Sequence, residues 1–93
     1  MKGVFKMVSR TVTVINEEGL HMRPAGALAK CAMSYENCEI TLVYNGRRTD
    51  AKSVMQIMLA GINCGAQPTI EVSGPDEQRV LDELAEQFAK GFD

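Results

Sequence analysis

The residues best suited to covalent chemistry stand together between Gly19 and Gly26, in the run Gly-Leu-His-Met-Arg-Pro-Ala-Gly. His21 is the single histidine of the chain, and Arg23 follows two positions later. An imidazole nitrogen can serve as a nucleophile, and the planar guanidinium group matches phosphate oxygens through paired hydrogen bonds. The spacing therefore predicts a histidine that carries a phosphoryl group.

Pro24 indicates where a helix begins, because its fixed φ is tolerated in a first helical turn. An alanine-rich run follows, so we expect a helix over residues 22–34 with His21 near its N-cap. The first backbone N–H groups of a helix lack partners within the helix, and the aligned peptide dipoles attract anions there. Met22 and Arg23 can offer such N–H groups, and Pro24 cannot. We predict His21 and Arg23 as catalytic residues, with Met22 and Arg23 binding the phosphate.

A purely structural interpretation competes with this one, because a histidine is often only a capping residue and a first-turn arginine is often solvated. A cation is, however, electrostatically misplaced at a helix N-terminus unless an anion visits it. We therefore favour the phosphate site over the structural interpretation.

The stretch around His21 resembles the active-site signature of the HPr family, the histidine-containing phosphocarriers of the bacterial phosphoenolpyruvate-dependent phosphotransferase system. A second stretch, Lys52-Ser53-Val54-Met55, resembles the family's second motif, which opens a short middle helix. The likeness extends from about Val8 to Gly91. It implies a stoichiometric carrier, rather than a turnover enzyme, that takes a phosphoryl group from enzyme I and passes it to an enzyme IIA-type acceptor of the sugar or nitrogen branch.

Two departures from the family pattern bear on its use. Met22 fills a place that alanine usually holds, which would narrow access to His21 or extend an apolar contact. The ending Gly91-Phe92-Asp93 resembles the nitrogen-branch homologue more than the sugar-branch one, so the branch stays open.

The predicted short helix over Ser53–Ala60 is apolar on nearly every side, with Gln56 as its polar exception. A short helix on a single sheet cannot bury all of these side chains, so we expect Val54, Met55 and Met58 to form an exposed docking patch, although a helix sunk in the core is the alternative. The family uses this helix to contact partners.

Ser53 fits an S-x-x-Q capping box with Gln56, which alone would explain it. In some bacteria a dedicated kinase phosphorylates the family's serine at this place, so the resemblance makes Ser53 a candidate regulatory residue. The alternative function is therefore a regulatory interaction protein that acts through Ser53 and the short helix without phosphoryl relay. A generic α+β binding domain is a further rival.

Composition excludes several other classes of protein. The chain has 93 residues and a net charge of −2, with no cluster of basic residues larger than Arg47-Arg48, so the footprint of nucleic-acid binding is missing. No apolar run is long enough for membrane insertion or for a signal peptide, so we expect a cytoplasmic protein. We also expect it to be a monomer. Cys31, Cys38 and Cys64 form no metal-binding pattern with the single histidine, and we predict free thiols, no metal and no cofactor.

The remaining elements follow from hydropathy periods and turn residues. Strands are predicted around Thr11–Val14, over Cys38–Tyr44, over Arg47–Ala51 as a polar edge, and over Thr69–Ser73. Asn45-Gly46 predicts a type I′ hairpin. A last helix begins at Pro75 and ends at Lys90-Gly91, with an inward stripe of Val80, Leu81, Leu84, Ala85 and Phe88. The order βαββαβα predicts a single α+β domain over residues 1–93, with residues 1–7 as an N-terminal extension. Its architecture is an open-faced sandwich, antiparallel throughout as the resemblance implies, in which three helices cover one side of four strands.

Overall fold

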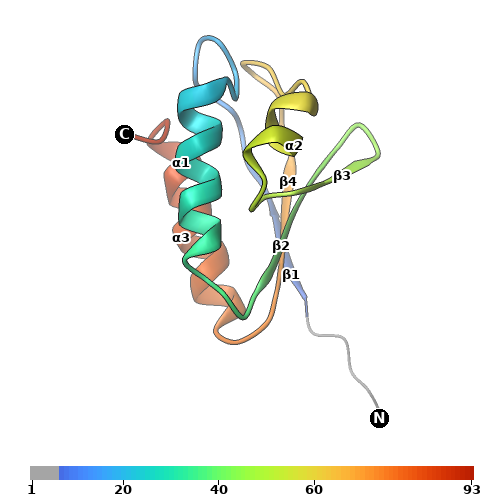
Figure 1. The fold of residues 1–93 in the computed structure, drawn as a ribbon, viewed down its shortest axis with the longest axis vertical. Coiled ribbons are helices and arrows are strands. Elements are labelled where there is room, and N and C mark those ends of the chain that lie inside the picture. Colours follow the sequence, from blue (N-terminus) through green and yellow to red (C-terminus); the bar gives the residue numbers. More distant parts are fainter. Residues whose placement is uncertain (1–6) are drawn as a thin grey trace.

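The computed structural model describes residues 7–93, and the predicted extension lies outside these residues except for Met7. The strands and helices follow one another in the order β1 (Val8–Thr11), α1 (Met22–Met33), β2 (Glu39–Tyr44), β3 (Arg47–Asp50), α2 (Val54–Leu59), β4 (Thr69–Ser73) and α3 (Glu77–Ala89). In Figure 1, α1 and α3 lie to the left of the strands, with α1 nearer the viewer, and the shorter α2 lies beside α1.

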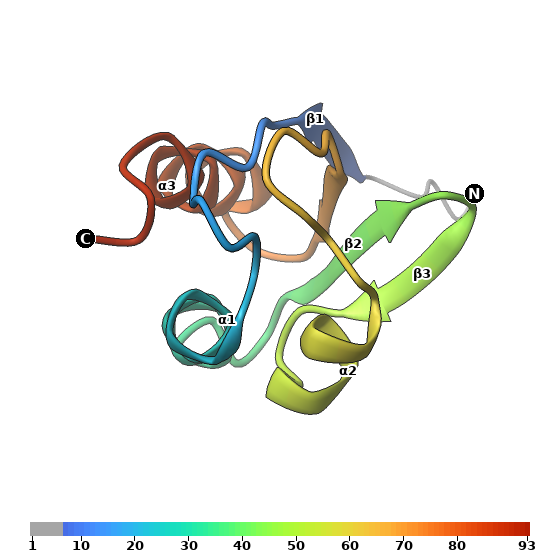
Figure 2. The ribbon, with the colours of Figure 1, turned by 90° about the horizontal axis from the view of Figure 1, so that it is seen from above.

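The four strands form one antiparallel sheet in the order β1-β4-β2-β3. The three helices lie on one face of this sheet, as the view from above shows (Figure 2). The open-faced sandwich predicted from the sequence is confirmed. The polar strand β3 is an edge strand, also as predicted, and Asn45 and Gly46 before it both have positive φ (53° and 76°), as the hairpin requires.

Each long helix turns its predicted apolar stripe toward the sheet. The buried residues of α1 are Pro24, Ala25, Leu28, Ala29 and Ala32, and those of α3 are Val80, Leu81, Leu84, Ala85 and Phe88. They meet Ile40, Leu42, Ile70 and Val72 from the two central strands in one apolar core. This core holds α1 on the sheet. Truncating a fully buried side chain such as Leu28 to alanine would lower the free energy of unfolding by about 2–5 kcal/mol.

Two predicted boundaries are wrong. The first strand lies at Val8–Thr11 and not at Thr11–Val14, although Val12 and Val14 are buried as the alternation indicated. Their N–H groups donate to the carbonyl oxygens of Pro68 and Ala66, at 3.0 and 2.9 Å. Because Pro68 has no N–H to return, the regular ladder stops before it.

The last helix begins at Glu77, not at Pro75. Asp76 is its N-cap in a left-handed conformation, with φ of 55°, and Gly74 precedes it with φ of 139°. A side chain on Gly74 would approach the carbonyl oxygen of Asn37 to 2.7 Å. The close passage of the loop after α1 therefore requires a glycine here and delays the start of the helix.

Candidate functional site

The loop before α1 is held in place by a glycine that no other residue can replace. Gly19 has φ of 71°, and a Cβ atom there would lie 2.5 Å from the carbonyl oxygen of Ile62 and 2.8 Å from Cα of Asn63. The next residue, Leu20, is buried and donates its N–H to the same Ile62 oxygen at 2.9 Å. These contacts fix the position at which the chain enters α1.

His21 is the N-cap of α1, as predicted, with an extended backbone at φ −77° and ψ −170°. Its carbonyl oxygen accepts from the N–H of Ala25 at 2.9 Å, while its half-buried side chain makes no capping hydrogen bond. The imidazole ring therefore does not cap the helix. The N–H groups of Met22 and Arg23 stand in the first turn, where α-helical geometry provides no partner, so they are available to an anion.

Arg23 does find an anion within the chain. Its Nη1 atom lies 3.9 Å from Oδ1 of Asp93, and both side chains are exposed, by 61% and 85%. The first turn of α1 contains no acidic residue of its own. Asp93 therefore supplies a negative charge that the sequence led us to expect only from a bound anion. No local sequence pattern could reveal this partner, because it lies 70 positions away in the chain.

A second contact fastens the same tail to the loop before His21. Nδ2 of Asn16 donates to the carbonyl oxygen of Gly91 at 2.9 Å, and the buried Oδ1 atom of Asn16 has no hydrogen-bond partner. Phe92 has φ of 64°, donates its N–H to Gln87 and packs edge-on against Phe88 with ring centres 4.9 Å apart. Asn16, Phe92 and Asp93 are neighbours of the site that no local sequence pattern indicated.

The short helix α2 carries the predicted second motif. The N–H of Gln56 donates to Oγ of Ser53 at 3.2 Å, so Ser53 caps the helix as expected. The reciprocal half of the capping box is wrong, because Oε1 of Gln56 accepts from the N–H of Asp50 at 3.0 Å, while the N–H of Ser53 donates to the carbonyl oxygen of Asp50. The glutamine instead ties α2 to the end of β3.

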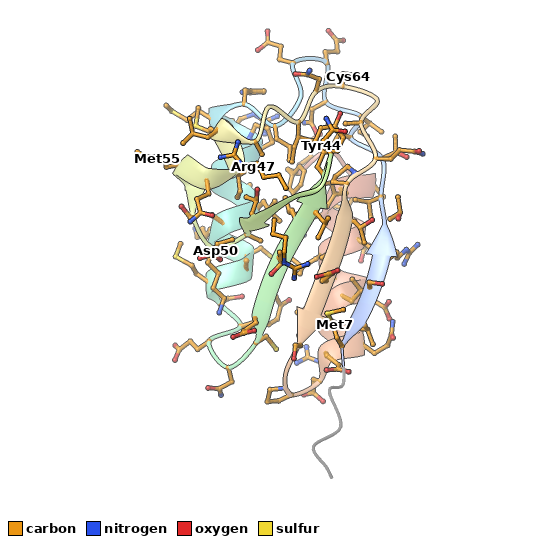
Figure 3. The ribbon with its side chains drawn as sticks, turned by 90° about the vertical axis from the view of Figure 1, so that its right-hand side faces the viewer. Met7, Tyr44, Arg47, Asp50, Met55 and Cys64 are labelled. Carbon is orange, nitrogen blue, oxygen red and sulfur yellow. The ribbon has the colours of Figure 1, made fainter. Side chains whose placement is uncertain are left out.

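Only Ile57 of α2 is buried, so the helix is not sunk in the core. Met55 is 71% exposed and projects from the helix in Figure 3, and Met58 is exposed as well. Val54, expected in the patch, is half-buried, and Leu59, not expected there, is 64% exposed. Met22, next to His21, is 69% exposed. Helical spacing alone could not decide between Val54 and Leu59, because the direction of the core is set by packing.

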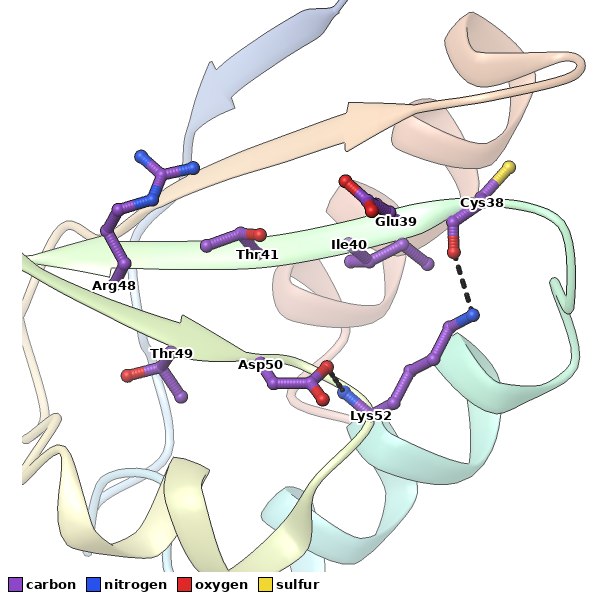
Figure 4. Close-up of a pocket in the computed structure, with 8 residues that line it drawn as sticks. All are labelled: Cys38, Glu39, Ile40, Thr41, Arg48, Thr49, Asp50 and Lys52. Atoms are coloured by element: carbon purple, nitrogen blue, oxygen red, sulfur yellow. Dashed lines mark hydrogen bonds between the residues drawn. The ribbon is translucent and has the colours of Figure 1, made fainter.

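Lys52, the first residue of the second motif, has a structural role. Its Nζ atom donates to the carbonyl oxygens of Cys38 at 2.7 Å and Tyr35 at 3.0 Å, which fastens the loop after α1. Figure 4 shows this ammonium group beside a hollow at the β2–β3 edge. The hollow is lined by Cys38, Glu39, Ile40, Thr41, Arg48, Thr49, Asp50 and Lys52, and therefore contains none of the predicted site residues.

The perturbed ionisable groups also lie at this far end of α1. The hydroxyl of Tyr35 donates to Glu83. Burial and this hydrogen bond raise the pKa of Tyr35 above its usual value. The same hydrogen bond, helped by the charge of Arg79 and opposed by burial, lowers the pKa of Glu83. Burial raises the pKa of the half-buried Cys31 thiol, which keeps it in the unreactive protonated form.

Within residues 7–93, no group of three or more His, Cys, Asp or Glu side chains could hold a metal ion. Cys31, Cys38 and Cys64 are free thiols, as predicted. None of the helices in this described part of the chain is long and apolar enough to cross a membrane. What the site offers is an imidazole, two N–H groups and a guanidinium group, which together can bind and carry an anion.

Comparison with known proteins gives a consistent result. A family model described as the PTS HPr component phosphorylation site matches residues 8–90. The phosphocarrier protein HPr of Chlamydia trachomatis is 38% identical over 85 residues, which cover 91% of this chain and 77% of the relative. That of Cupriavidus necator is 37% identical over 86 residues, covering 92% and 96%. A crystal structure of HPr from Bacillus anthracis has a TM-score of 0.82 at 33% identity, covering 88% and 96%.

Proposed function

Since the chain belongs to the HPr family of phosphocarriers of the phosphotransferase system, we propose that His21 accepts a phosphoryl group from enzyme I and donates it to an enzyme II component. The observation that carries this proposal is the position of His21 at the N-cap of α1, with a side chain that makes no capping bond. A ring that capped the helix would accept from one of the free N–H groups of that turn, whereas this ring leaves them available to an anion.

Transfer of this kind needs few parts from the carrier. The phosphorus–nitrogen bond of the donor's phosphohistidine breaks while a phosphorus–nitrogen bond to His21 forms, so one bond replaces another. In the family the attacking atom is Nδ1. Phosphoryl transfer depends mostly on in-line positioning and on stabilising charge. The N–H groups of Met22 and Arg23 and the guanidinium group of Arg23 supply that charge, and the partner supplies the rest.

Phosphorylation in vitro tests the relay. The protein is incubated with phosphoenolpyruvate and enzyme I, and the phosphorylated product is followed by intact-mass measurement. We expect an acid-labile, base-stable phosphate on the natural protein and none on His21→Ala. An acid-stable phosphate, or equal labelling of His21→Ala, would exclude His21 as the acceptor and favour the regulatory alternative.

The exposed apolar side chains that follow His21 in the chain and that lie on the neighbouring helix α2 are proposed as the docking site for enzyme I and for the acceptor. This surface consists of Met22, Met55, Met58 and Leu59, with Val54 at its half-buried edge. Flexible methionine side chains adapt to partners of different shape, and exposed apolar side chains gain free energy when a partner covers them. This surface contains both the predicted patch and the unusual methionine after the histidine.

A charge placed in the middle of this surface tests the docking proposal. Met55→Glu should weaken binding to enzyme I at least tenfold in a calorimetric titration, because a desolvated carboxylate is costly. The melting temperature should hardly change, since Met55 is exposed. Met33→Glu is the matched control, because Met33 is an exposed methionine at the other end of α1. Equal binding by both variants would remove α2 from the docking site.

Ser53 is proposed as a regulatory residue in a host that has the matching serine kinase. Its hydroxyl caps α2 and is only half-buried, so a phosphate there would meet the favourable end of the helix dipole. It would also bring a charge of roughly −2 beside Met55. Phosphorylation of Ser53 should therefore weaken docking without unfolding α2.

We further propose that the protein works as a monomer in the cytoplasm, as fits a carrier that meets several partners in turn.

A further inference from the structure

The two edges of the sheet differ in how their outward backbone groups are used. At the β3 edge, the N–H of Asp50 donates to Oε1 of Gln56 at 3.0 Å, and the carbonyl oxygen of Asp50 accepts from the N–H of Ser53 at 3.1 Å. The start of α2 therefore covers the outward groups at the end of this edge. A neighbouring chain cannot pair there without breaking these bonds.

The β1 edge has no such cover within residues 7–93. The N–H groups of Val12 and Val14 donate inward, across the sheet, and the direction alternates along an antiparallel strand. The backbone groups that turn outward are therefore those of Ser9, Thr11 and Thr13. β1 is the outermost strand on this side, as Figure 3 shows. Proteins often blunt such an edge with lysine or proline, and residues 8–15 contain neither.

A hollow of about 400 Å³ lies beside this edge, between β1 and α3. Apart from two threonines and one arginine, its lining is apolar and consists of Val12, Ile15, Ala85, Phe88 and Ala89. Ile15 is 53% exposed, although it is a large apolar residue. Every second side chain of a strand laid along β1 would point toward α3 and cover this lining.

Arg10 is the one charged residue that lines the hollow. Its Nη1 atom lies 4.0 Å from Oδ1 of Asp82, beyond hydrogen-bonding distance, and its side chain is 58% exposed. The same oxygen of Asp82 already accepts from Nε2 of Gln78 at 3.0 Å. Arg10 therefore keeps donors for another carboxylate, and the charge of the hollow favours an acidic residue in the chain that covers it.

We propose that the outer edge of β1 binds an extended segment of a partner protein, which joins the four-stranded sheet as an additional antiparallel strand. Hydrogen bonds to the outward backbone groups of β1 hold this segment. Two apolar side chains at alternate positions enter the hollow, and an acidic side chain two positions later pairs with Arg10. The segment therefore reads apolar-x-apolar-x-acidic from its N-terminus, because an antiparallel strand passes Val14 first and Arg10 last.

This edge is separate from the docking surface proposed for the phosphoryl relay. Figure 2 shows β1 and α2 at opposite sides of the sheet, and the strand order places β1 and β3 at its two edges. The protein can therefore hold a segment on β1 while its docking surface is in use. The proposal also stands if the relay fails, since it uses none of the residues around His21.

A titration followed by nuclear magnetic resonance tests the proposal. The labelled natural protein is titrated with the synthetic peptide acetyl-Ser-Val-Thr-Ile-Ser-Asp-Ser-amide. The N–H signals of Ser9, Thr11 and Thr13 should shift, and these groups should become protected from hydrogen exchange. A peptide of the same composition with its valine and isoleucine adjacent should bind about fivefold more weakly, because the alternation is lost. Unchanged β1 signals at millimolar peptide would overturn the proposal.

A charge exchange tests the part assigned to Arg10. Arg10→Glu should weaken binding of the peptide about tenfold, because an attraction becomes a repulsion. A peptide with lysine in place of its aspartate should recover the lost affinity with this variant. Arg47→Glu, at the opposite edge of the sheet, is the matched control and should bind like the natural protein. Equal weakening in both variants would show an effect of net charge alone and would exclude Arg10 from the site.

A backbone substitution tests the strand pairing itself. Thr11→Pro removes one outward N–H and leaves the inward hydrogen bonds in place, so it should weaken binding about tenfold. Thr11→Ala is the control, because both variants lose the hydroxyl contact with Thr69 and only alanine keeps the N–H. Equal binding by the two folded variants would exclude strand addition. If Thr11→Pro does not fold, the charge exchange at Arg10 decides alone.

Sedimentation of the protein without peptide distinguishes the other possible occupant. A monomer is expected. A dimer whose formation protects the β1 N–H groups would show that a second copy of the chain takes this edge, and it would overturn the proposal of a partner segment.

Discussion

The two ends of α1 treat their polar groups in opposite ways. At the start of the helix, the His21 side chain caps nothing, two N–H groups stand without intrahelical partners, and the one ion pair is long and exposed. At its end, Oγ of Ser34 donates to the carbonyl oxygen of Cys31 at 2.6 Å, and Lys52 donates to two further carbonyls. The polar groups at the first end are left open, whereas most of those at the second end and in the loop after it have partners.

The start of α1 therefore presents the reactive groups, whereas the end of α1 contributes to the stability of the fold. Groups that already have partners hold the fold, and they cannot also bind a passing ligand without a cost of about 1–3 kcal/mol for each bond broken. Groups without partners contribute little to the fold and can bind an anion. Substitutions at the start of α1 should therefore change phosphoryl transfer, and substitutions at its end should change stability.

The largest effect is expected at the open end. Arg23→Ala should slow phosphoryl transfer about tenfold to a hundredfold, because a cation that stabilises the transferred group is lost. The free energy of unfolding should change by no more than about 0.5 kcal/mol, since the side chain is exposed. Rapid-quench kinetics and denaturant titration measure the two quantities. Arg10→Ala serves as control, and equal transfer rates in both variants would remove Arg23 from the site.

At the end of α1, Lys52→Met should lower the free energy of unfolding by about 2–3 kcal/mol. Methionine keeps much of the stem but leaves the carbonyl oxygens of Cys38 and Tyr35 without their charged donor. Denaturant unfolding followed by circular dichroism measures the loss. Lys30→Met, at an exposed position of α1, should be nearly neutral. A neutral Lys52→Met would show that these bonds do not secure the end of the helix.

A smaller loss of stability is expected from Tyr35→Phe. The phenyl ring preserves the packing and removes the hydroxyl group, which donates to Glu83 and also interacts with the Cys31 thiol, so the free energy of unfolding should fall by about 1 kcal/mol. Tyr44→Phe in β2 leaves that bond intact and is the control. Equal stability of the two variants would contradict the view that the bond supports this end of α1.

The pH dependence should show the smallest and most specific effect. The pKa of Tyr35 is higher in the folded protein than in the unfolded chain, so the folded state binds the phenolic proton more tightly. This contribution is fully present below the unfolded value, near pH 10, and is lost as the pH rises above it. Stability should fall less between pH 10 and 11 in Tyr35→Phe than in the natural protein. Parallel pH profiles would refute this linkage.

Local patterns predicted most of the fold and the centre of the site. The stripe of α1, the cap at Ser53 and the Asn45-Gly46 turn each depend on neighbours a few positions away, and each was predicted correctly. The boundary errors have distant causes. The first strand ends where Pro68 faces it across the sheet, and the last helix is delayed by the approach of Asn37 to Gly74.

The amino-acid sequence by itself determined the βαββαβα order and the place of a histidine and an arginine at the first turn of a helix, because backbone preferences and hydropathy periods act over a few residues. Tertiary structure alone decided that Asp93 meets Arg23, that Asn16 holds the tail, and that Leu59 rather than Val54 faces outward. Such contacts join residues far apart in the chain, and their geometry is fixed only when the whole core packs.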